Sequence, residues 1–207
     1  MGCRKLPAVV LFDADGVVQT FEEGWLTQTA TLSGSPEGSE DFVRELFAAE
    51  QPCLRGDGDF PAVIAQLLAR WSSRHTVDEV LGMFRRIEPF PETLDLVGRL
   101  RASGIACHLA SNQEPQRSTY MSRDLGYSEL FDAEHYSWDI GAMKPEADYY
   151  ERVGARIPHA TSSLLFIDDR PENVTAARAA GWRAERYYYR EGLDALKDLL
   201  ARNGLQV

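Results

Sequence analysis

The stretch Ala8-Val9-Val10-Leu11-Phe12-Asp13-Ala14-Asp15-Gly16 joins a strand pattern to acidic residues at the strand's end. Its first five residues are apolar and include two adjacent β-branched valines, which is typical of a strand buried on both faces of a parallel sheet. Carboxylates directly after such a strand are costly for folding, and ligands of open α/β sheets bind at the carboxyl ends of strands. The stretch therefore predicts a parallel sheet with a binding site at one edge.

The second half of the chain predicts further strands that alternate with helices. Buried strands are expected over residues 105–110 and 163–167, a weaker one near 131–137 and a short one over 183–189. Helices are expected over residues 91–103, 115–125, 146–154, 171–180 and 192–202. This alternation predicts an α/β fold, a Rossmann-like parallel sheet with helices on both faces.

A long helical block separates the first strand from the others. Residues 37–50, 60–71 and 77–86 carry apolar side chains at three- and four-residue spacing, with Gly, Pro and Ser between the segments. We therefore expect two domains, an α/β core over residues 1–19 and 88–207 and an all-helical domain over residues 20–87. Within this block, Trp25, Arg44 and Arg55 are candidates to face a ligand, although a role on the solvated surface is the simpler interpretation of each.

The composition narrows the class of protein. The chain has 207 residues, of which 44% are hydrophobic and 26% charged, and this excludes wholesale disorder and a small disulfide scaffold. The net charge of −10 repels nucleic-acid phosphates and anionic lipid surfaces. No apolar run is long enough for a transmembrane helix or a signal peptide. We expect a cytoplasmic monomer or homodimer that binds neither nucleic acid nor membrane.

The cysteines also favour a cytoplasmic protein. Cys3, Cys53 and Cys107 are odd in number, far apart and without a CxxC pair. Such a pattern favours reduced, mostly buried thiols over a zinc site or a disulfide framework.

Polar residues follow three of the predicted strands at the points where they end: Asp13 and Asp15, Ser111 and Asn112, Asp168 and Asp169. In a parallel sheet these ends lie along one edge, so four carboxylates would converge on one crevice. Carboxylates this close raise one another's pKa unless a cation neutralises them. Mg²⁺ suits a site with few protein ligands, several waters and a substrate phosphate. Lys144, one of only three lysines, adds a compact positive charge before Pro145.

Four short segments resemble, in order and spacing, the sequence motifs of the haloacid dehalogenase (HAD) superfamily: Phe12-Asp13-Ala14-Asp15-Gly16-Val17, Ala110-Ser111-Asn112, Lys144-Pro145 and Phe166-Ile167-Asp168-Asp169. The resemblance covers essentially the whole chain, and the helical block resembles the smaller helical cap of that superfamily. Each motif alone is short, so the signal lies in the ordered set. The chain is similar to the glucose-1-phosphate phosphatase-like and phosphoglycolate phosphatase-like branch.

The resemblance implies a role for each motif residue. Asp13 is implied to be the nucleophile that forms an aspartyl-phosphate, and Asp15 the acid and base that protonates the leaving oxygen and then activates water. Ser111 and Lys144 are the other implied catalytic residues, one bonding a phosphoryl oxygen and the other offsetting negative charge. The residues implied to bind the phosphoryl group are Ala14, Ser111, Asn112 and Lys144.

The resemblance also implies a Mg²⁺ site. Its ligands would be a carboxylate oxygen of Asp13, the backbone carbonyl of Asp15 and one acid of the pair that ends the third strand. Asp169 is favoured as the direct ligand, with Asp168 as its neighbour or as the alternative ligand.

The function implied is a Mg²⁺-dependent phosphatase acting on a small phosphomonoester, a sugar phosphate or similar metabolite. Two alternatives stay open: a β-phosphoglucomutase-like phosphomutase, and a non-catalytic metabolite-binding protein on the same scaffold. The acidic stretch after the first strand is a poor calcium loop, because Val17 and Val18 stand where further oxygen ligands are needed.

Overall fold

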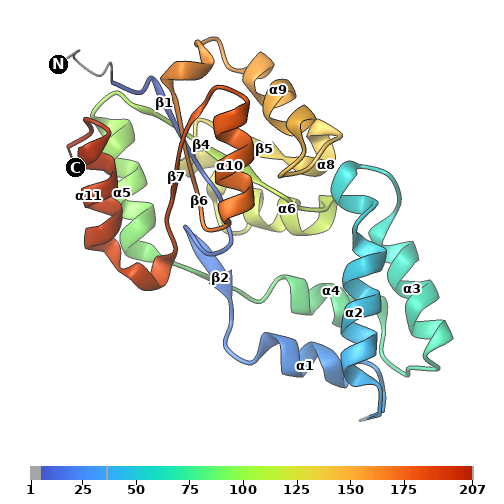
Figure 1. Cartoon of the computed structure of the whole chain (residues 1–207). Helices are drawn as coiled ribbons and strands as arrows, with labels where there is room; N and C mark the ends of the chain where they lie inside the picture. The colour runs from blue at the N-terminus through green and yellow to red at the C-terminus, as the bar shows by residue number, and fades with distance from the viewer. Residues whose placement is uncertain (1–5, 36, 207) are drawn as a thin grey trace.

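A computed structural model of the chain describes residues 6–35 and 37–206, and a parallel sheet forms its centre. The sheet is built from β1 (Val9–Phe12), β4 (Ala106–Ser111), β5 (Ala133–Tyr136), β6 (Leu164–Asp168) and β7 (Arg183–Arg186). The strand order is β5-β4-β1-β6-β7, and every neighbouring pair is parallel. Because β1 lies in the middle, its carboxyl end is flanked by the ends of β4 and β6 (Figure 1).

Helices cover both faces of this sheet. The core helices are α5 (Pro91–Ala102), α6 (Pro115–Arg123), α7 (Tyr127–Leu130), α8 (Ser137–Ile140), α9 (Ala147–Arg156), α10 (Pro171–Ala179) and α11 (Leu193–Arg202), with the 3₁₀ turns η2 (Thr161–Ser163) and η3 (Tyr189–Glu191). Val10 and Phe12 of β1 share one apolar cluster with α5, α6 and α11, whereas Val9 and Leu11 share another with α9 and α10. This alternation is the two-sided burial that the first strand predicts, and the expected fold class is confirmed.

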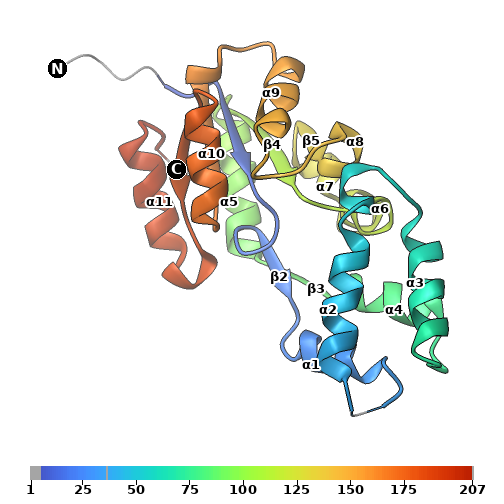
Figure 2. The ribbon, with the colours of Figure 1, turned by 45° about the vertical axis from the view of Figure 1, so that its right-hand side comes forward.

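The helical block between β1 and the rest of the sheet has a hydrophobic cluster of its own. It comprises α1 (Trp25–Thr31), α2 (Ser39–Glu50), η1 (Cys53–Arg55), α3 (Phe60–Arg70) and α4 (Val77–Phe84). Phe42 and Ile64 are among its fully buried side chains. In Figures 1 and 2 these helices lie beyond the carboxyl end of β1.

A short antiparallel ribbon joins this block to the core. It pairs β2 (Gln19–Phe21) with β3 (Ile87–Pro89). The sequence pattern did not indicate these strands, because three residues are too few to express a two-residue period. The ribbon brings the two connections between the block and the core side by side.

The last predicted strand is too long by three residues. β7 ends at Arg186, and the expectation that Tyr189 belongs to the strand is wrong. The backbone N–H of Tyr189 donates to the carbonyl of Gly16 at 2.9 Å. Tyr189 is therefore hydrogen-bonded to the loop after β1 and not to a neighbouring strand. The chain after β7 therefore turns toward the site, and Tyr188 lines its cavity.

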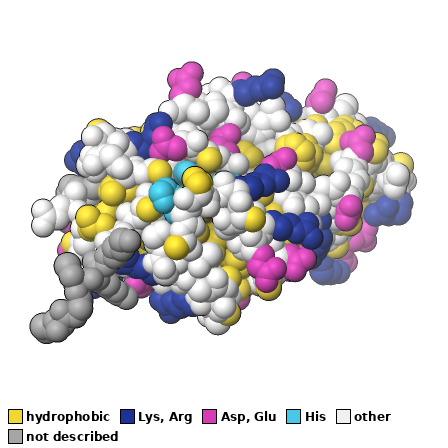
Figure 3. Space-filling model, turned by 90° about the horizontal axis from the view of Figure 1, so that it is seen from above, with side chains coloured by type: hydrophobic (Ala, Val, Ile, Leu, Met, Phe, Trp, Pro, Cys, Tyr) yellow, Lys and Arg dark blue, Asp and Glu magenta, His cyan; other side chains and the backbone are white. Residues whose placement is uncertain are grey.

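Cys53 and Cys107 are buried and free, while Cys3 lies outside the described residues. No described helix combines the length and the apolar composition needed to cross a bilayer. Acidic and basic side chains are interspersed on the face in Figure 3, so this face carries charge of mixed sign.

Candidate active site

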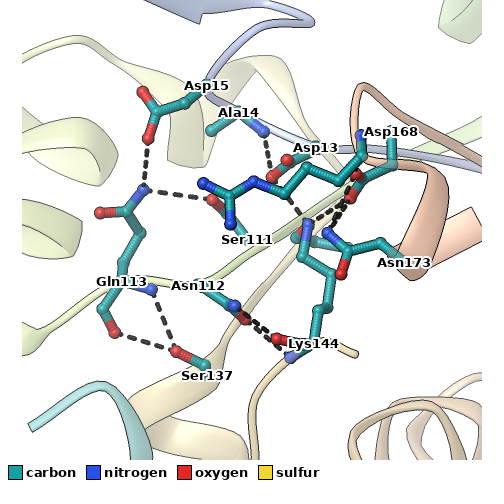
Figure 4. A network of polar contacts seen from close by, with 12 residues as sticks. Asp13, Ala14, Asp15, Ser111, Asn112, Gln113, Ser137, Lys144, Asp168 and Asn173 are labelled. Carbon is teal, nitrogen blue, oxygen red and sulfur yellow. Dashed lines mark hydrogen bonds and ion pairs between the residues drawn. The ribbon is translucent and has the colours of Figure 1, made fainter. Parts of the chain in front are cut away.

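The strand ends bring the predicted site residues together, as the parallel order requires. Phe12, the last residue of β1, pairs with Leu109 of β4 and with Ile167 of β6, so Asp13 follows beside Ser111 and Asp168 (Figure 4). Between these ends and the helical block lies a cavity of about 380 Å³. The predicted residues that line it are Asp13, Asp15, Ser111, Asn112, Lys144 and Asp169.

Lys144 is buried between two of the carboxylates. Its Nζ lies 2.8 Å from Asp13 Oδ1 and 2.7 Å from Asp168 Oδ2. It also donates to the carbonyl of Ala110 at 2.9 Å. Burial alone would lower the pKa of Lys144, but the two carboxylates outweigh this effect and raise it, so the ammonium form is stable.

The side chain of Asn112 positions the loop that carries Lys144. Its amide donates to the carbonyl of Lys144 at 2.8 Å, and its oxygen accepts from the backbone N–H of Lys144 at 2.9 Å. The Asn112 side chain is therefore committed to this loop, and its backbone N–H is the group left for a phosphoryl oxygen.

The two adjacent acids after β6 differ in their surroundings. Asp168 is fully buried and accepts from Lys144, from the backbone N–H of Arg170 at 2.8 Å and from Asn173 Nδ2 at 3.0 Å. The carboxylate of Asp169 is half-buried and accepts no hydrogen bond from another residue of the described chain. Of the two acids, Asp169 therefore keeps its oxygen atoms available.

The donor set fits a hard divalent cation. Asp13, Asp168 and Asp169 each offer a carboxylate oxygen within 4.8 Å of the other two. Burial raises the pKa of Asp13 to about 7, although Lys144 acts in the opposite direction. Three carboxylates this close, with one lysine among them, carry the negative excess and the oxygen ligands that Mg²⁺ binds in proteins.

The loop after β1 depends on glycine at one position. Gly16 has a φ of +85°, and a Cβ there would lie 2.8 Å from Asp169 Oδ2. Any side chain would strain the backbone and collide with the carboxylate, so Gly16 keeps the loop and Asp169 in close contact. Nearby, the N–H of Ala14 donates to Asp13 Oδ1 at 2.7 Å.

Asp15 is held by residues that the sequence analysis did not single out. Arg117 of α6 donates to both of its carboxylate oxygens, at 2.7 and 2.8 Å. Gln113 adds a bond at 3.2 Å to Asp15 and another at 3.1 Å to Ser111 Oγ, and Gln19 adds one at 3.0 Å to Asp15. Burial alone would raise the pKa of Asp15, but Arg117 outweighs it and holds the pKa below the usual value.

Glu50 is the other residue that sequence reasoning missed. It ends α2, is 7% exposed and lines the cavity. Burial raises its pKa to about 8. A signal was present, because Glu50 continues the four-residue spacing of Phe42 and Leu46, which form the buried face of α2. An acid on an apolar helix face is an exception that warrants notice.

The three candidates in the helical block do not line this cavity. Trp25 is buried in the block's own cluster and donates to the carbonyl of Met83. Arg44 is exposed and pairs with Asp41 of its own helix. Arg55 reaches the core but is paired there with Glu146.

Comparisons with known proteins agree with this arrangement. A family model described as haloacid dehalogenase-like hydrolase matches residues 7–181. The chain is 31% identical over 108 residues to a sesquiterpene phosphatase, astK, of Aspergillus oryzae, covering 50% of this chain and 55% of the relative. It is 27% identical over 129 residues to the phosphoglycolate phosphatase of Escherichia coli, covering 56% and 51%. The chain thus spans about half the length of these curated relatives.

Solved structures extend the likeness of fold to nearly the whole chain. A HAD family enzyme from Bacteroides thetaiotaomicron has a TM-score of 0.80 at 17% identity, covering 93% of this chain and 98% of that one. The L-2-haloacid dehalogenase of Xanthobacter autotrophicus has a TM-score of 0.65 at 20% identity, covering 95% and 83%. At these identities the likeness concerns the fold.

Proposed function

The chain belongs to the haloacid dehalogenase-like hydrolases, and from this premise we propose that it is a Mg²⁺-dependent phosphatase acting on a small phosphomonoester, a sugar phosphate or similar metabolite. The observation that carries the proposal is that Asp13 and Asp15 line the same cavity and that Lys144 forms an ion pair with Asp13. The second acid favours phosphoryl transfer over dehalogenation, because a phosphate ester needs a proton donor for its leaving oxygen. Relatives named as phosphatases support the same class.

In the first half-reaction, a carboxylate oxygen of Asp13 attacks phosphorus and forms an acyl phosphate. The bond between phosphorus and the leaving oxygen breaks, and that oxygen takes a proton from Asp15. Because Arg117 holds the pKa of Asp15 low, Asp15 first takes this proton from the monoprotonated phosphate of the ester. Ser111 Oγ and the backbone N–H of Asn112 are the donors for the phosphoryl oxygens. Lys144 offsets the negative charge that gathers on Asp13 and the phosphoryl group.

In the second half-reaction, Asp15 takes a proton from water. The water oxygen attacks phosphorus, the bond to Asp13 breaks, and inorganic phosphate leaves while Asp13 is regenerated. The two hydrogen bonds from Arg117 to Asp15 suit this half-reaction, because they orient Asp15 and favour the carboxylate form that accepts the proton.

Mg²⁺ would be held by the carboxylates of Asp13 and Asp169 and the backbone carbonyl of Asp15. When bound, it supplies positive charge that neutralises the phosphoryl oxygens and the surrounding acids. Asp168 acts through Lys144 and Asn173, which occupy its oxygen atoms. A structurally similar Bacteroides thetaiotaomicron enzyme, solved with magnesium and inorganic phosphate, supports this choice of metal.

The domain division follows from the same proposal. We assign residues 20–87 to a cap domain and residues 1–19 and 88–207 to the core. The separate apolar cluster of the helical block supports the division, and both boundaries fall in the β2–β3 ribbon. A cap over the strand ends would exclude water from the phosphoryl group and limit the size of the substrate.

The test is hydrolysis of p-nitrophenyl phosphate with Mg²⁺. We expect turnover that is lost on exhaustive chelation and that falls about 10³-fold or more in Asp13→Asn, because the amide cannot form the acyl phosphate. Asp57→Asn, an exposed acid of the cap, should retain the full rate. Undiminished turnover in folded Asp13→Asn would reject the covalent mechanism. Transfer of phosphate within a sugar phosphate, without release, would indicate a phosphomutase instead.

A further inference from the structure

The part of the cavity formed by the cap is largely apolar, with one carboxylate, one amide and one hydroxyl group. Its lining residues are Phe21, Phe47, Leu54 and Phe84, together with Thr20, Glu50 and Gln51. The three phenylalanine rings all pack against Trp25, at centroid distances of 4.2, 5.7 and 5.6 Å. These contacts hold the rings as a wall, which we call the aromatic wall (Phe21, Phe47 and Phe84).

Glu50 stands in this apolar surrounding without a partner. It is 7% exposed, and its carboxylate has no hydrogen bond or ion pair with any residue that the structure describes. As the last residue of α2, it lies at the end of the helix that points toward the core (Figure 2). An unpaired buried carboxylate is costly to a fold, so the empty site favours the protonated form of Glu50, and a cationic ligand that supplies the missing partner favours the charged form.

The charges around Glu50 favour a positive partner. The charged side chains that act on it are Asp15, Glu114 and Arg117. The guanidinium of Arg117 is already forked onto Asp15, and both oxygens of Glu114 accept backbone N–H groups of α6 at 2.6 Å. Arg85 also acts on Glu114, whereas Arg117 is the one cation among those that act on Glu50, against the two acids Asp15 and Glu114. The carboxyl end of α2 adds the partial negative charge of its free carbonyl groups.

The aromatic wall is also suited to a cation. The face of an aromatic ring attracts positive charge through its quadrupole. Phe21 already shows this property, because the Cζ of Arg117 lies 4.2 Å from its ring centroid. A second cation in this part of the cavity would lie among the aromatic rings and Glu50, which line it together.

We propose that Glu50 and the aromatic wall bind a protonated amine on the leaving group, so that the substrate is a phosphomonoester of an amino alcohol. The inference rests on the proposed function, which places the phosphate end at Asp13. A neutral hydroxyl group would satisfy one oxygen of Glu50 but would leave the excess of negative charge and the ring faces unmatched. An ammonium group matches all three.

The test uses phosphonates, which cannot be hydrolysed, and measures their binding to the Mg²⁺-loaded protein by calorimetry. Three series of alkyl phosphonates end in an amine, a hydroxyl or a methyl group. Each series contains chains of two to six carbons, so that compounds of the same length can be compared. We expect the best aminoalkyl phosphonate to bind about tenfold or more tightly than its methyl-terminated counterpart, because its charged hydrogen bond forms in a desolvated place. The hydroxyl series should fall between.

Two variants of α2 test whether Glu50 causes the amine preference. Glu50→Gln keeps the shape and removes the group that can become a carboxylate opposite a bound ammonium, so the ratio between the amine and methyl series should fall to about one. Glu40→Gln, an exposed acid of the same helix, should keep the wild-type ratio. Thermal unfolding checks that both variants are folded.

The outcomes separate this inference from the proposed function. Equal affinities of the three series, absence of phosphonate binding, or an amine preference that survives Glu50→Gln would each overturn the amine subsite. Binding requires no turnover, so an amine preference in a protein that does not hydrolyse p-nitrophenyl phosphate would reject the phosphatase and keep the subsite. Hydrolysis without amine preference would do the reverse.

Discussion

Asp15 and Arg117, which are 102 positions apart in the sequence, are joined by two part-buried hydrogen bonds that form a fork. Two parallel hydrogen bonds fix both the position and the rotation of the carboxylate, which a single bond does not do. Arg117 also donates to the carbonyl of Phe84 at 2.9 Å, so the same side chain touches the cap. We therefore regard Arg117 as the residue that positions Asp15.

Replacing Arg117 by Lys tests this role. Lysine keeps the charge but loses the fork, so Asp15 is expected to transfer protons less well. We expect kcat/KM for an alkyl phosphate, which reports the first half-reaction, to fall about 10–100-fold, and kcat/KM for p-nitrophenyl phosphate to fall less, because nitrophenolate leaves without a proton. Steady-state kinetics with both substrates measure the difference, and Arg123→Lys, exposed at the end of α6, is the control. Equal losses on both substrates would contradict the role.

The 3₁₀ turn η1 is one of the elements through which the cap contacts the core. It packs against α8, and Arg55 of η1 pairs with Glu146 of the core. This ion pair is partly exposed and contributes little by itself. The close approach is made possible by Gly56, whose φ is +81° and whose Cβ position would lie 2.5 Å from the carbonyl oxygen of Trp138.

Gly56→Ala is expected to push η1 away from α8. The methyl group meets backbone that cannot move freely, and the positive φ adds about 1–2 kcal/mol of strain. We expect a lower melting temperature and a kcat/KM for p-nitrophenyl phosphate that is reduced about tenfold. Gly82→Ala in α4 is the matched control, because a Cβ there meets no atom within 4 Å and alanine is the better helix former. Identical behaviour of the two variants would show that η1 does not position the cap.

The stability of the whole molecule contains a histidine contribution that depends on pH. His135 of β5 is 4% exposed, and its Nε2 lies 3.1 Å from Nδ1 of His108 on the neighbouring strand β4. Burial lowers the pKa of His135 to about 4, and His108 contributes in the same direction. Between pH 6.5 and 4 the unfolded chain therefore binds a proton that the folded chain does not bind, so acidification through this window reduces the free energy of unfolding.

Denaturant unfolding at pH 7.5 and pH 5 measures this contribution. We expect the wild type to lose about 1–2 kcal/mol more than His135→Gln between these two values. The wild type has to be compared with the variant, because Glu50 and Asp13 also change the stability with pH. Their pKa values are raised, so acidification through them stabilises the folded state, the opposite of the effect of His135. His159→Gln, an exposed histidine, should follow the wild type. A loss in His135→Gln equal to that of the wild type would reject the assignment.

The architecture and the meeting of the motif residues were predictable from the sequence. Apolar strands such as Val9–Phe12 express their burial in local composition, and parallel pairing then places Asp13, Ser111 and Asp168 at one edge. The strand at 183–189 was overestimated because Tyr187, Tyr188 and Tyr189 suit a strand locally, whereas the hydrogen bond from Tyr189 to Gly16 is not local.

Only the tertiary structure identified Arg117, Gln113 and Glu50 at the cavity. Their partners lie 102 and 98 positions away for the first two, and Glu50 has no side-chain partner among the described residues. A one-dimensional pattern records the environment that a residue shares with its chain neighbours. Pairing, desolvation and enclosure depend on which distant segments pack together, so they are decided when the cap and the core come into contact.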